Sequence, residues 1–286
     1  MTILAIDIGG TAIKYALVDE NNNLSSFSEI PSEAKLGAEV LLKKVYGIIE
    51  EFSPLCDAVS VSTAGRVDSE KGEIIFANEN IPNYTGTELA RLISERFSLP
   101  AFVENDVYCA ATAEANYGSG KGSKNFICLT VGTGIGGAVI LDGKLYKGDS
   151  LCAGDFGEMI TGSDKFENLA STTALVKRIK LVTGKEMSGR EIFSEENFSN
   201  DLIKSTVDAW IDELVKGIKT LMFVFDVPLF VLGGGIMNER YITDRVIGEI
   251  HSTDRENFKR VQIKQAFFKN KAGIIGAAHT AREKLK

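Results

Sequence analysis

A chain of 286 residues is long enough to bury a large core in one or two lobes without disulfide or metal support. Hydrophobic residues make up 44% of it and charged residues 25%, which excludes disordered and fibrous classes. The net charge of -7, without any run of Lys and Arg, argues against a nucleic-acid-binding protein, because contact with phosphate groups needs a basic face.

The N-terminal stretch MTILAIDIGG carries an Asp in its first apolar run and no basic region before it, so we expect neither a signal peptide nor a membrane anchor. The most apolar later stretch, residues 221–236, is interrupted by Asp226, Pro228 and glycines and is too short to span a bilayer. The cysteines form no CxxC pair, and we expect a cytoplasmic protein with four buried free thiols, at Cys56, Cys109, Cys128 and Cys152.

Two hairpins of similar plan lie about a hundred residues apart and predict two similar lobes. Residues 3–19 read as a strand, a Gly-rich turn and a second strand, followed by the turn at residues 21–23. Residues 126–145 repeat this order, with the glycine turn at residues 132–137 and a return strand that runs into Asp142-Gly143.

Apolar spacing predicts the other main elements. Residues 40–49 keep helical spacing and residues 58–61 read as a short buried strand, which gives a βββαβ order. Intervals of three and four predict a long amphipathic helix from Ile203 to Phe225, with Trp210 in the core. Residues 229–232 then form a buried strand that ends in three glycines, and residues 272–286 a closing helix rich in small residues.

Two glycine motifs imitate other nucleotide sites. Gly132, Gly134 and Gly137 match GxGxxG, but a strand follows them where a dinucleotide fingerprint needs a helix N-terminus. Residues 118–123 imitate a P-loop, but Lys121 is followed by Gly122 and we expect a surface turn.

The remaining interpretation is that the glycine turns of the two hairpins bind phosphate. Backbone N–H groups at glycines can approach phosphate oxygens without a Cβ in the way, and Thr11 can add its hydroxyl. Asp7 at the end of a strand can hold a hydrated Mg²⁺. Either turn alone could be a tight hairpin with a capping Asp, but both turns, together with the glycines at 233–235, favour a phosphate site.

Five segments resemble the ROK family of bacterial sugar kinases over essentially the whole chain: residues 7–14, 104–106, 129–137, 232–235 and 272–278. The resemblance implies a two-lobed α/β protein of the actin-like ATPase fold, a duplicated RNase H-like βββαβα plan with ATP and Mg²⁺ in the interlobe cleft. It places residues 1–107 and about 270–286 in the N-terminal lobe, with the sugar and the first phosphate turn, and residues 108–269 in the C-terminal lobe.

The resemblance also implies which residues hold the nucleotide. One phosphate turn would consist of Asp7, Gly9, Gly10, Thr11 and Lys14, with Asp7 reaching Mg²⁺ through water. The second would be Gly132, Thr133 and Gly134, and the strand end at Gly233, Gly234 and Gly235 would lie against adenosine.

Phosphoryl transfer to a sugar hydroxyl needs a base and an in-line hydroxyl. Asp106 follows the strand at residues 101–103 and opens an Ala-rich segment, so the pattern alone allows either a helix cap or a base at the site. The Glu-Asn-Asp resemblance to the family's catalytic motif implies that Asp106 is the base and that Asn105 positions sugar hydroxyls.

Further sugar contacts are implied one at a time. Residues 62–68 resemble a G-x-P-G loop near the sugar, with Ala64 at the proline position before Gly65, and Asn80 resembles a hydroxyl-binding Asn. Residues 153–158 resemble the family's G-E-x-G-H segment, with Asp155 where Glu is usual and Glu158 where His is usual, and Glu167 falls where a further sugar-binding Glu is expected.

The largest departure is the loop at residues 159–166, which lacks the family's CxCGxxGC zinc motif and holds no Cys or His, so we expect no zinc site. Members without zinc resemble β-glucoside kinases, which phosphorylate the 6-hydroxyl of the non-reducing glucose of disaccharides such as cellobiose. The alternative acceptors are glucose and N-acetylmannosamine.

Other classes are less well supported. A sugar-responsive regulator of the same family would need a helix-turn-helix domain, for which strand residues beginning by Ile3 leave no room. An ATPase that acts on protein partners is disfavoured by the short chain and by Asn105-Asp106. A small sugar or glycoside is the expected partner, no membrane or nucleic acid is expected, and a homodimer follows by analogy alone.

Overall fold

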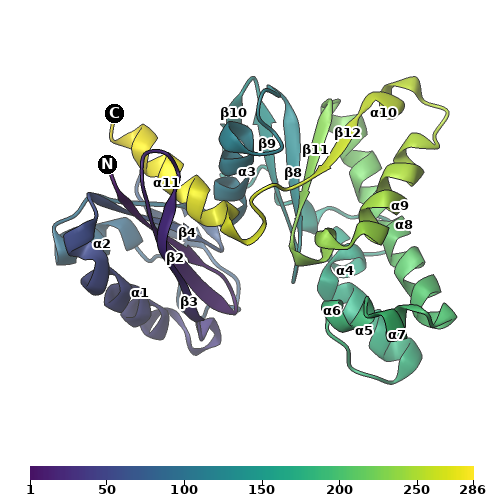
Figure 1. Cartoon of the computed structure of the whole chain (residues 1–286), viewed down its shortest axis with the longest axis horizontal. Coiled ribbons are helices and arrows are strands. Elements are labelled where there is room, and N and C mark those ends of the chain that lie inside the picture. Colours follow the sequence, from purple (N-terminus) through teal and green to yellow (C-terminus); the bar gives the residue numbers. More distant parts are fainter. The chain divides into compact units, whose positions relative to one another are not determined.

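The computed structural model describes residues 1–286, and the chain divides into two compact units (Figure 1). The first unit contains Met1–Tyr117, Gly148–Cys152 and Lys271–Lys286, and the second contains Gly118–Lys147 and Ala153–Asn270. The sequence placed the first boundary at residue 107. Helix α3 (Asp106–Tyr117) instead belongs to the first unit, because it packs along helix α11 (Ala272–Lys284).

The first unit is built on a five-stranded sheet of order β3-β2-β1-β4-β7. The first two strands form the antiparallel hairpin predicted from residues 3–19, β3 adds a third antiparallel strand, and β4 and β7 continue the sheet in parallel to β1. The strands are β1 (Ile3–Ile8), β2 (Ala12–Val18), β3 (Leu24–Pro31), β4 (Ala58–Thr63) and β7 (Ala101–Asn105), with a separate small hairpin of β5 (Arg66–Asp68) and β6 (Glu73–Phe76).

Helices cover both faces of this sheet (Figure 1). Leu4, Ile6 and Ile8 belong to a core shared with α1 (Ala38–Phe52) and α2 (Leu89–Phe97). Alternate side chains point the other way, toward α11, where the Ser60 hydroxyl donates to the Ala277 carbonyl at 2.7 Å. Short 3-10 turns at Ala34–Leu36 and Ser53–Leu55 flank α1.

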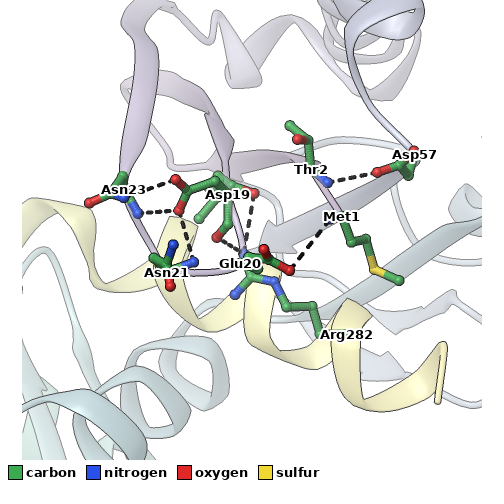
Figure 2. A network of polar contacts seen from close by, with 9 residues as sticks. Met1, Thr2, Asp19, Glu20, Asn21, Asn23, Asp57 and Arg282 are labelled. Carbon is green, nitrogen blue, oxygen red and sulfur yellow. Dashed lines mark hydrogen bonds and ion pairs between the residues drawn. The ribbon is translucent and has the colours of Figure 1, made fainter.

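Arg282 ties the far end of α11 to the β2–β3 turn (Figure 2). Its guanidinium donates to Asn22 Oδ1 at 2.7 Å and to the carbonyl of Asp19 at 2.5 Å. Asp19 in turn accepts hydrogen bonds from Asn21 and Asn23, which closes the turn predicted at residues 21–23. The C-terminal helix is therefore tied to the β2–β3 turn of the N-terminal sheet.

The second unit repeats the sheet in the order β10-β9-β8-β11-β12, again with two antiparallel and two parallel pairings. The predicted second hairpin and the buried strand at 229–232 are confirmed. The strands are β8 (Phe126–Val131), β9 (Ile135–Leu141), β10 (Lys144–Tyr146), β11 (Leu229–Gly233) and β12 (Gln262–Gln265). The predicted turn at residues 118–123 lies between α3 and β8.

A helical layer packs against this second sheet around α8 (Asp201–Phe225), which confirms the long predicted helix. Trp210 is fully buried and its indole N–H donates to the Ser171 carbonyl at 2.9 Å, so the predicted core role is also confirmed. The other helices are α4 (Phe166–Ala170), α5 (Thr172–Thr183), α6 (Gly189–Ile192), α7 (Glu195–Phe198), α9 (Arg240–His251) and α10 (Glu256–Arg260), with 3-10 turns at Phe156–Glu158, Gly235–Asn238 and Lys269–Lys271.

The four cysteines are free, as predicted, but only Cys109 and Cys128 are buried. Cys56 and Cys152 are half-buried, because both lie in loops and not in the strands or helices of a core. No helix in the chain combines the length and the apolar character needed to cross a bilayer.

Candidate functional site

Three parallel strands of the first unit end at one edge of its sheet and bring polar side chains there. In the register, Asp7 of β1 lies opposite Ser62 of β4, and Thr63 lies opposite Asn105 of β7. The Ser62 hydroxyl donates to Asp7 Oδ1 at 2.6 Å, and Lys14 Nζ of β2 lies 3.9 Å from Asp7 Oδ2. The carboxyl ends of parallel strands are where open α/β sheets bind ligands.

Helix α11 begins beside the Asp7 carboxylate. A Cβ added to Gly273, in its first turn, would lie 2.5 Å from Asp7 Oδ1. The free N–H groups of a helix N-terminus favour a negative group at this place. Burial nevertheless raises the pKa of Asp7, against the lowering effects of the Ser62 hydrogen bond and the Lys14 charge.

Asn105 and Asp106 form the junction between β7 and α3. Asn105 Oδ1 accepts from the backbone N–H groups of Val107 and Tyr108 at 2.9 and 3.0 Å, so Asn105 caps the helix. Its amide Nδ2 donates to the Gly65 carbonyl at 2.9 Å and to Asp106 Oδ1 at 3.0 Å. The capping role considered for Asp106 therefore falls mainly on Asn105, although Asp106 Oδ1 also accepts from Val107.

The Asp106 carboxyl group has a strongly altered acidity. Burial, and next the negative charge of Asp7, raise its pKa to about 7, while hydrogen bonds from Val107 and Asn105 oppose the shift. A carboxyl group with a pKa near neutrality is matched to accepting a proton at the pH of the cell.

The remaining predicted residues of the first unit lie on turns. Gly9 donates its N–H to the Ala12 carbonyl at 3.0 Å, and Gly10 and Thr11 are exposed at the tip. Gly65, with a positive φ of 101°, follows Ala64 and is joined to Asn105. Asn80 is exposed in a loop, and no contact joins it to Asp7 or Asp106.

In the second unit, the structure brings the predicted glycine turn together with Glu167 and Gly234. The turn is closed by the Gly132 N–H, which donates to the Gly134 carbonyl at 3.0 Å. A Cβ at Gly134 would lie 2.5 Å from Glu167 Oε2, and one at Gly234 would overlap the carbonyl of Val131. Thr133, between the two glycines, is exposed, as are Gly234 and Gly235 after the buried Gly233.

Asp155 and Glu158 lie on the exposed side of the turn that precedes α4. Glu158 Oε2 forms an ion pair with Lys165 Nζ at 2.7 Å, and this pair raises the pKa of Lys165. Gly157, between them, is buried, and a Cβ there would lie 3.0 Å from Glu167 Oε2.

No contact with Asp7 was predicted for Ser62 or Gly273, although both lie in segments that resemble the family, and no role was predicted for Lys165. Ser62 could have been found, because its strand ends at the same sheet edge as the strand of Asp7. Gly273 stands in a run of small residues typical of close helix packing, but nothing in that run indicates Asp7 as its neighbour. The pairing of Lys165 depends on the fold of the shortened loop.

The first unit's carboxylates fit a magnesium ion that is shared with phosphate groups. Mg²⁺ in such sites takes one or two carboxylates and keeps several waters. Asp7 and Asp106 are close enough for the Asp7 charge to raise the Asp106 pKa, and a bound cation would relieve this repulsion. No group of three or more His, Cys, Asp and Glu side chains suited to enclose a metal occurs in the chain.

A cavity of about 520 Å³ in the first unit lies elsewhere, between the N-terminal ends of α1 and α2. Gly37, Glu39, Glu88 and Arg91 are among its lining residues, and it contains none of the residues described above.

Two solved structures of sugar kinases are similar to this chain over nearly its whole length. A ROK family glucokinase from Streptomyces griseus, solved with glucose and AMPPNP, is 27% identical over 99% of this chain and 100% of its own, with a TM-score of 0.87. A Listeria monocytogenes protein proposed to be an N-acetylmannosamine kinase is 26% identical over the whole of both chains, with a TM-score of 0.91. The predicted actin-like ATPase fold and sugar-kinase class are thereby confirmed.

The chain belongs to the ROK family, whose model matches residues 3–284. Among its relatives, an uncharacterised protein of Clostridium perfringens is 40% identical over 97% of both chains. A β-glucoside kinase of Listeria innocua is 29% identical over 98% of this chain and 97% of its own.

Proposed function

We propose that this sugar kinase uses ATP to phosphorylate the 6-hydroxyl of the non-reducing glucose of β-glucosides such as cellobiose. The observation that carries the proposal is the junction at the end of β7, where Asn105 holds Asp106 and the Asp106 pKa is raised to about 7. A base of this kind suits a neutral alcohol acceptor, which must lose its proton during transfer.

The chemistry assigned to this junction is a single transfer. The acceptor oxygen forms a bond to the γ-phosphorus as the bond between that phosphorus and the ADP oxygen breaks, and the hydroxyl proton goes to Asp106. Both described hydrogen bonds of the Asp106 side chain reach Oδ1, so we assign the proton to Oδ2. Asn105 orients Asp106 and the acceptor hydroxyls.

The nucleotide is assigned to glycine turns of both units. In the first, Gly9, Gly10, Thr11 and Lys14 would contact phosphate oxygens, and Asp7 would hold Mg²⁺ through water; the ion supplies charge neutralisation on the phosphates. In the second, the donors would be the turn residues Gly132, Thr133 and Gly134, with adenosine against Gly233, Gly234 and Gly235. The close approach of Gly234 to Val131, next to this turn, supports that assignment.

The acceptor is assigned to Asp155, Glu158, Glu167, Ala64, Gly65 and Asn80. Of these, Gly65 lies beside the Asn105–Asp106 junction, since its carbonyl accepts a hydrogen bond from Asn105, and this position supports its assignment. The Glu158–Lys165 pair supports a glycoside acceptor, because a charged pair stands where the family usually has His. The second candidate is a hexose kinase, since one solved relative is a glucokinase and another is proposed to act on N-acetylmannosamine.

An acceptor panel tests the proposal. ADP release is measured with glucose, N-acetylmannosamine, cellobiose and methyl β-glucoside at saturating Mg²⁺ and ATP. We expect kcat/KM for cellobiose to exceed that for glucose by at least about tenfold, or roughly 1.4 kcal/mol of transition-state discrimination. A larger value for glucose or N-acetylmannosamine would replace the glycoside assignment by the hexose-kinase one.

The proposal also includes a cytoplasmic location, supported by four cysteines that remain free thiols. A homodimer is proposed by family analogy alone, and light scattering of the purified chain at micromolar concentration would test it.

A further inference from the structure

The segment that replaces the family's zinc loop is a tight hairpin. Ile160 and Lys165 form an antiparallel bridge, and the Thr161 N–H donates to the Asp164 carbonyl at 3.1 Å across the turn. Asp164 Oδ1 also accepts from the Lys165 N–H at 2.7 Å and from Asn168 Nδ2 at 3.0 Å. Hydrogen bonds within the loop therefore close this turn.

Both ends of the hairpin are anchored in the second unit's core. Phe166 is fully buried, and its ring packs so closely on helix α8 that a Cβ at Gly217 would overlap it. The Phe166 N–H donates to the carbonyl of Met159 at 2.7 Å, and Met159 packs against the same core. Ile160 is the exception among the apolar side chains of this segment, because 70% of it is exposed.

The bridge also determines what lies beside Ile160. Residues directly opposite each other in an antiparallel pair project to the same face, so the Ile160 and Lys165 side chains are neighbours. Lys165 Nζ in turn contacts Glu158 Oε2 at 2.7 Å. One face of the hairpin thus presents a branched apolar side chain, the methylene chain of a lysine, an ammonium group and a carboxylate.

This face stands between two elements that the proposed function assigns to the acceptor. Asp155 precedes and Glu158 ends the 3-10 turn before this face, and α4 after it carries Glu167, whose carboxylate lies beside Gly134 and Gly157. Pyranose rings have an apolar C–H face and a rim of hydroxyl groups. Apolar side chains with a few fixed polar groups are the usual surface for such a ligand.

We propose that Ile160, Lys165 and Glu158 form a subsite for the second pyranose ring of the acceptor, the ring linked to the glucose that is phosphorylated. The inference rests on the proposed β-glucoside kinase function. The C–H face of this ring packs on Ile160 and on the Lys165 methylenes, and its hydroxyls bond the Glu158 carboxylate and the Lys165 ammonium.

Comparison of cellobiose with methyl β-glucoside tests the subsite, because both are β-glucosides and only cellobiose has a second ring. The measurement is the ratio of kcat/KM for the two acceptors, in the wild type, in Ile160→Asp and in Ile160→Ala. Leu181→Asp is the matched control, because Leu181 is an 86% exposed apolar residue on α5 of the same unit. We expect the ratio to fall at least about fivefold in Ile160→Asp, less in Ile160→Ala, and not at all in the control.

The outcomes separate the two proposals. If the wild type prefers both glycosides to glucose but the Ile160 variants leave the ratio unchanged, the kinase assignment stands and the subsite is wrong. If the wild type prefers glucose to both glycosides, the acceptor assignment is wrong and the subsite falls with it. Ile160→Ala keeps the test valid should Ile160→Asp fail to fold.

Discussion

Asp7 Oδ1 lies so close to the first turn of α11 that a methyl group at Gly273 would come 2.5 Å from it. The carboxylate thus accepts a hydrogen bond from Ser62 on one side and lies beside the first turn of α11 on the other. This position explains why a small residue is needed at Gly273, as the close approach of the Cys109 carbonyl explains it at Gly276.

Gly273→Ala is therefore expected to displace the Asp7 carboxylate and to impair the reaction while the helix itself gains propensity. We expect kcat/KM for Mg-ATP to fall by about tenfold or more, with a higher Mg²⁺ requirement. Gly47→Ala in α1 is the matched control, because nothing lies within 4 Å of a Cβ there. The control should keep full activity and gain roughly 0.5–1 kcal/mol of stability. A normal Mg²⁺ dependence in Gly273→Ala would argue that Asp7 does not hold the metal.

Asp106→Asn should bind nucleotide and sugar but lose about a thousandfold or more in turnover, because the proton acceptor is removed while the shape is kept. In the wild type, kcat/KM should rise with pH through about 7 as the carboxyl group loses its proton. Initial rates between pH 5.5 and 9 measure both. Retention of more than about a tenth of wild-type turnover in the variant would remove Asp106 from this role.

The raised pKa of Asp106 also predicts a stability effect of defined sign. A carboxyl group with a pKa of 3.8 when unfolded and about 7 when folded stabilises the fold below pH 3.8, and this contribution is lost as the pH rises through 7. Asp106→Asn should thus unfold at a higher temperature than the wild type at pH 8 and show no such advantage near pH 4. Equal thermal midpoints at pH 8 would mean that the carboxylate is not destabilised in the folded protein.

Gly134→Ala tests the second unit's turn. Its methyl group would displace the end of the flexible Glu167 side chain, so we expect a normal fold. It would also occupy the space through which a phosphate group approaches the backbone of the turn, so we expect a KM for ATP raised by about tenfold. Gly248→Ala in α9, where a Cβ has open space, provides the comparison. An unchanged ATP dependence would show that this turn does not contact the nucleotide.

Much of the architecture could be predicted because its determinants are local. The short apolar runs of β1 and β8, each followed by a glycine turn, indicate hairpins, and the intervals from Ile203 to Phe225 indicate a helix. Asp106 could be placed at the strand-to-helix junction for the same reason, whereas its role as the base was implied only by the resemblance to the family's Glu-Asn-Asp motif.

The contacts that hold these side chains in place could not be predicted, because they join residues far apart in the sequence or depend on the fold of a loop. Ser62 is 55 residues from Asp7, and their hydrogen bond depends on the register of two parallel strands. The approach of Gly273 depends on how the last helix crosses the first strand. The Glu158–Lys165 pair needs a hairpin that local apolar periodicity does not indicate.

The position of the phosphate in the product formed from cellobiose and ATP distinguishes a β-glucoside kinase from the alternatives. Phosphorus–proton NMR correlation of the purified product identifies the phosphorylated carbon. We expect one phosphate, on the 6-oxygen of the non-reducing glucose, formed with one ADP per turnover and lost in Asp106→Asn. A phosphate on the reducing ring, or ATP hydrolysis with no phosphorylated sugar, would contradict it.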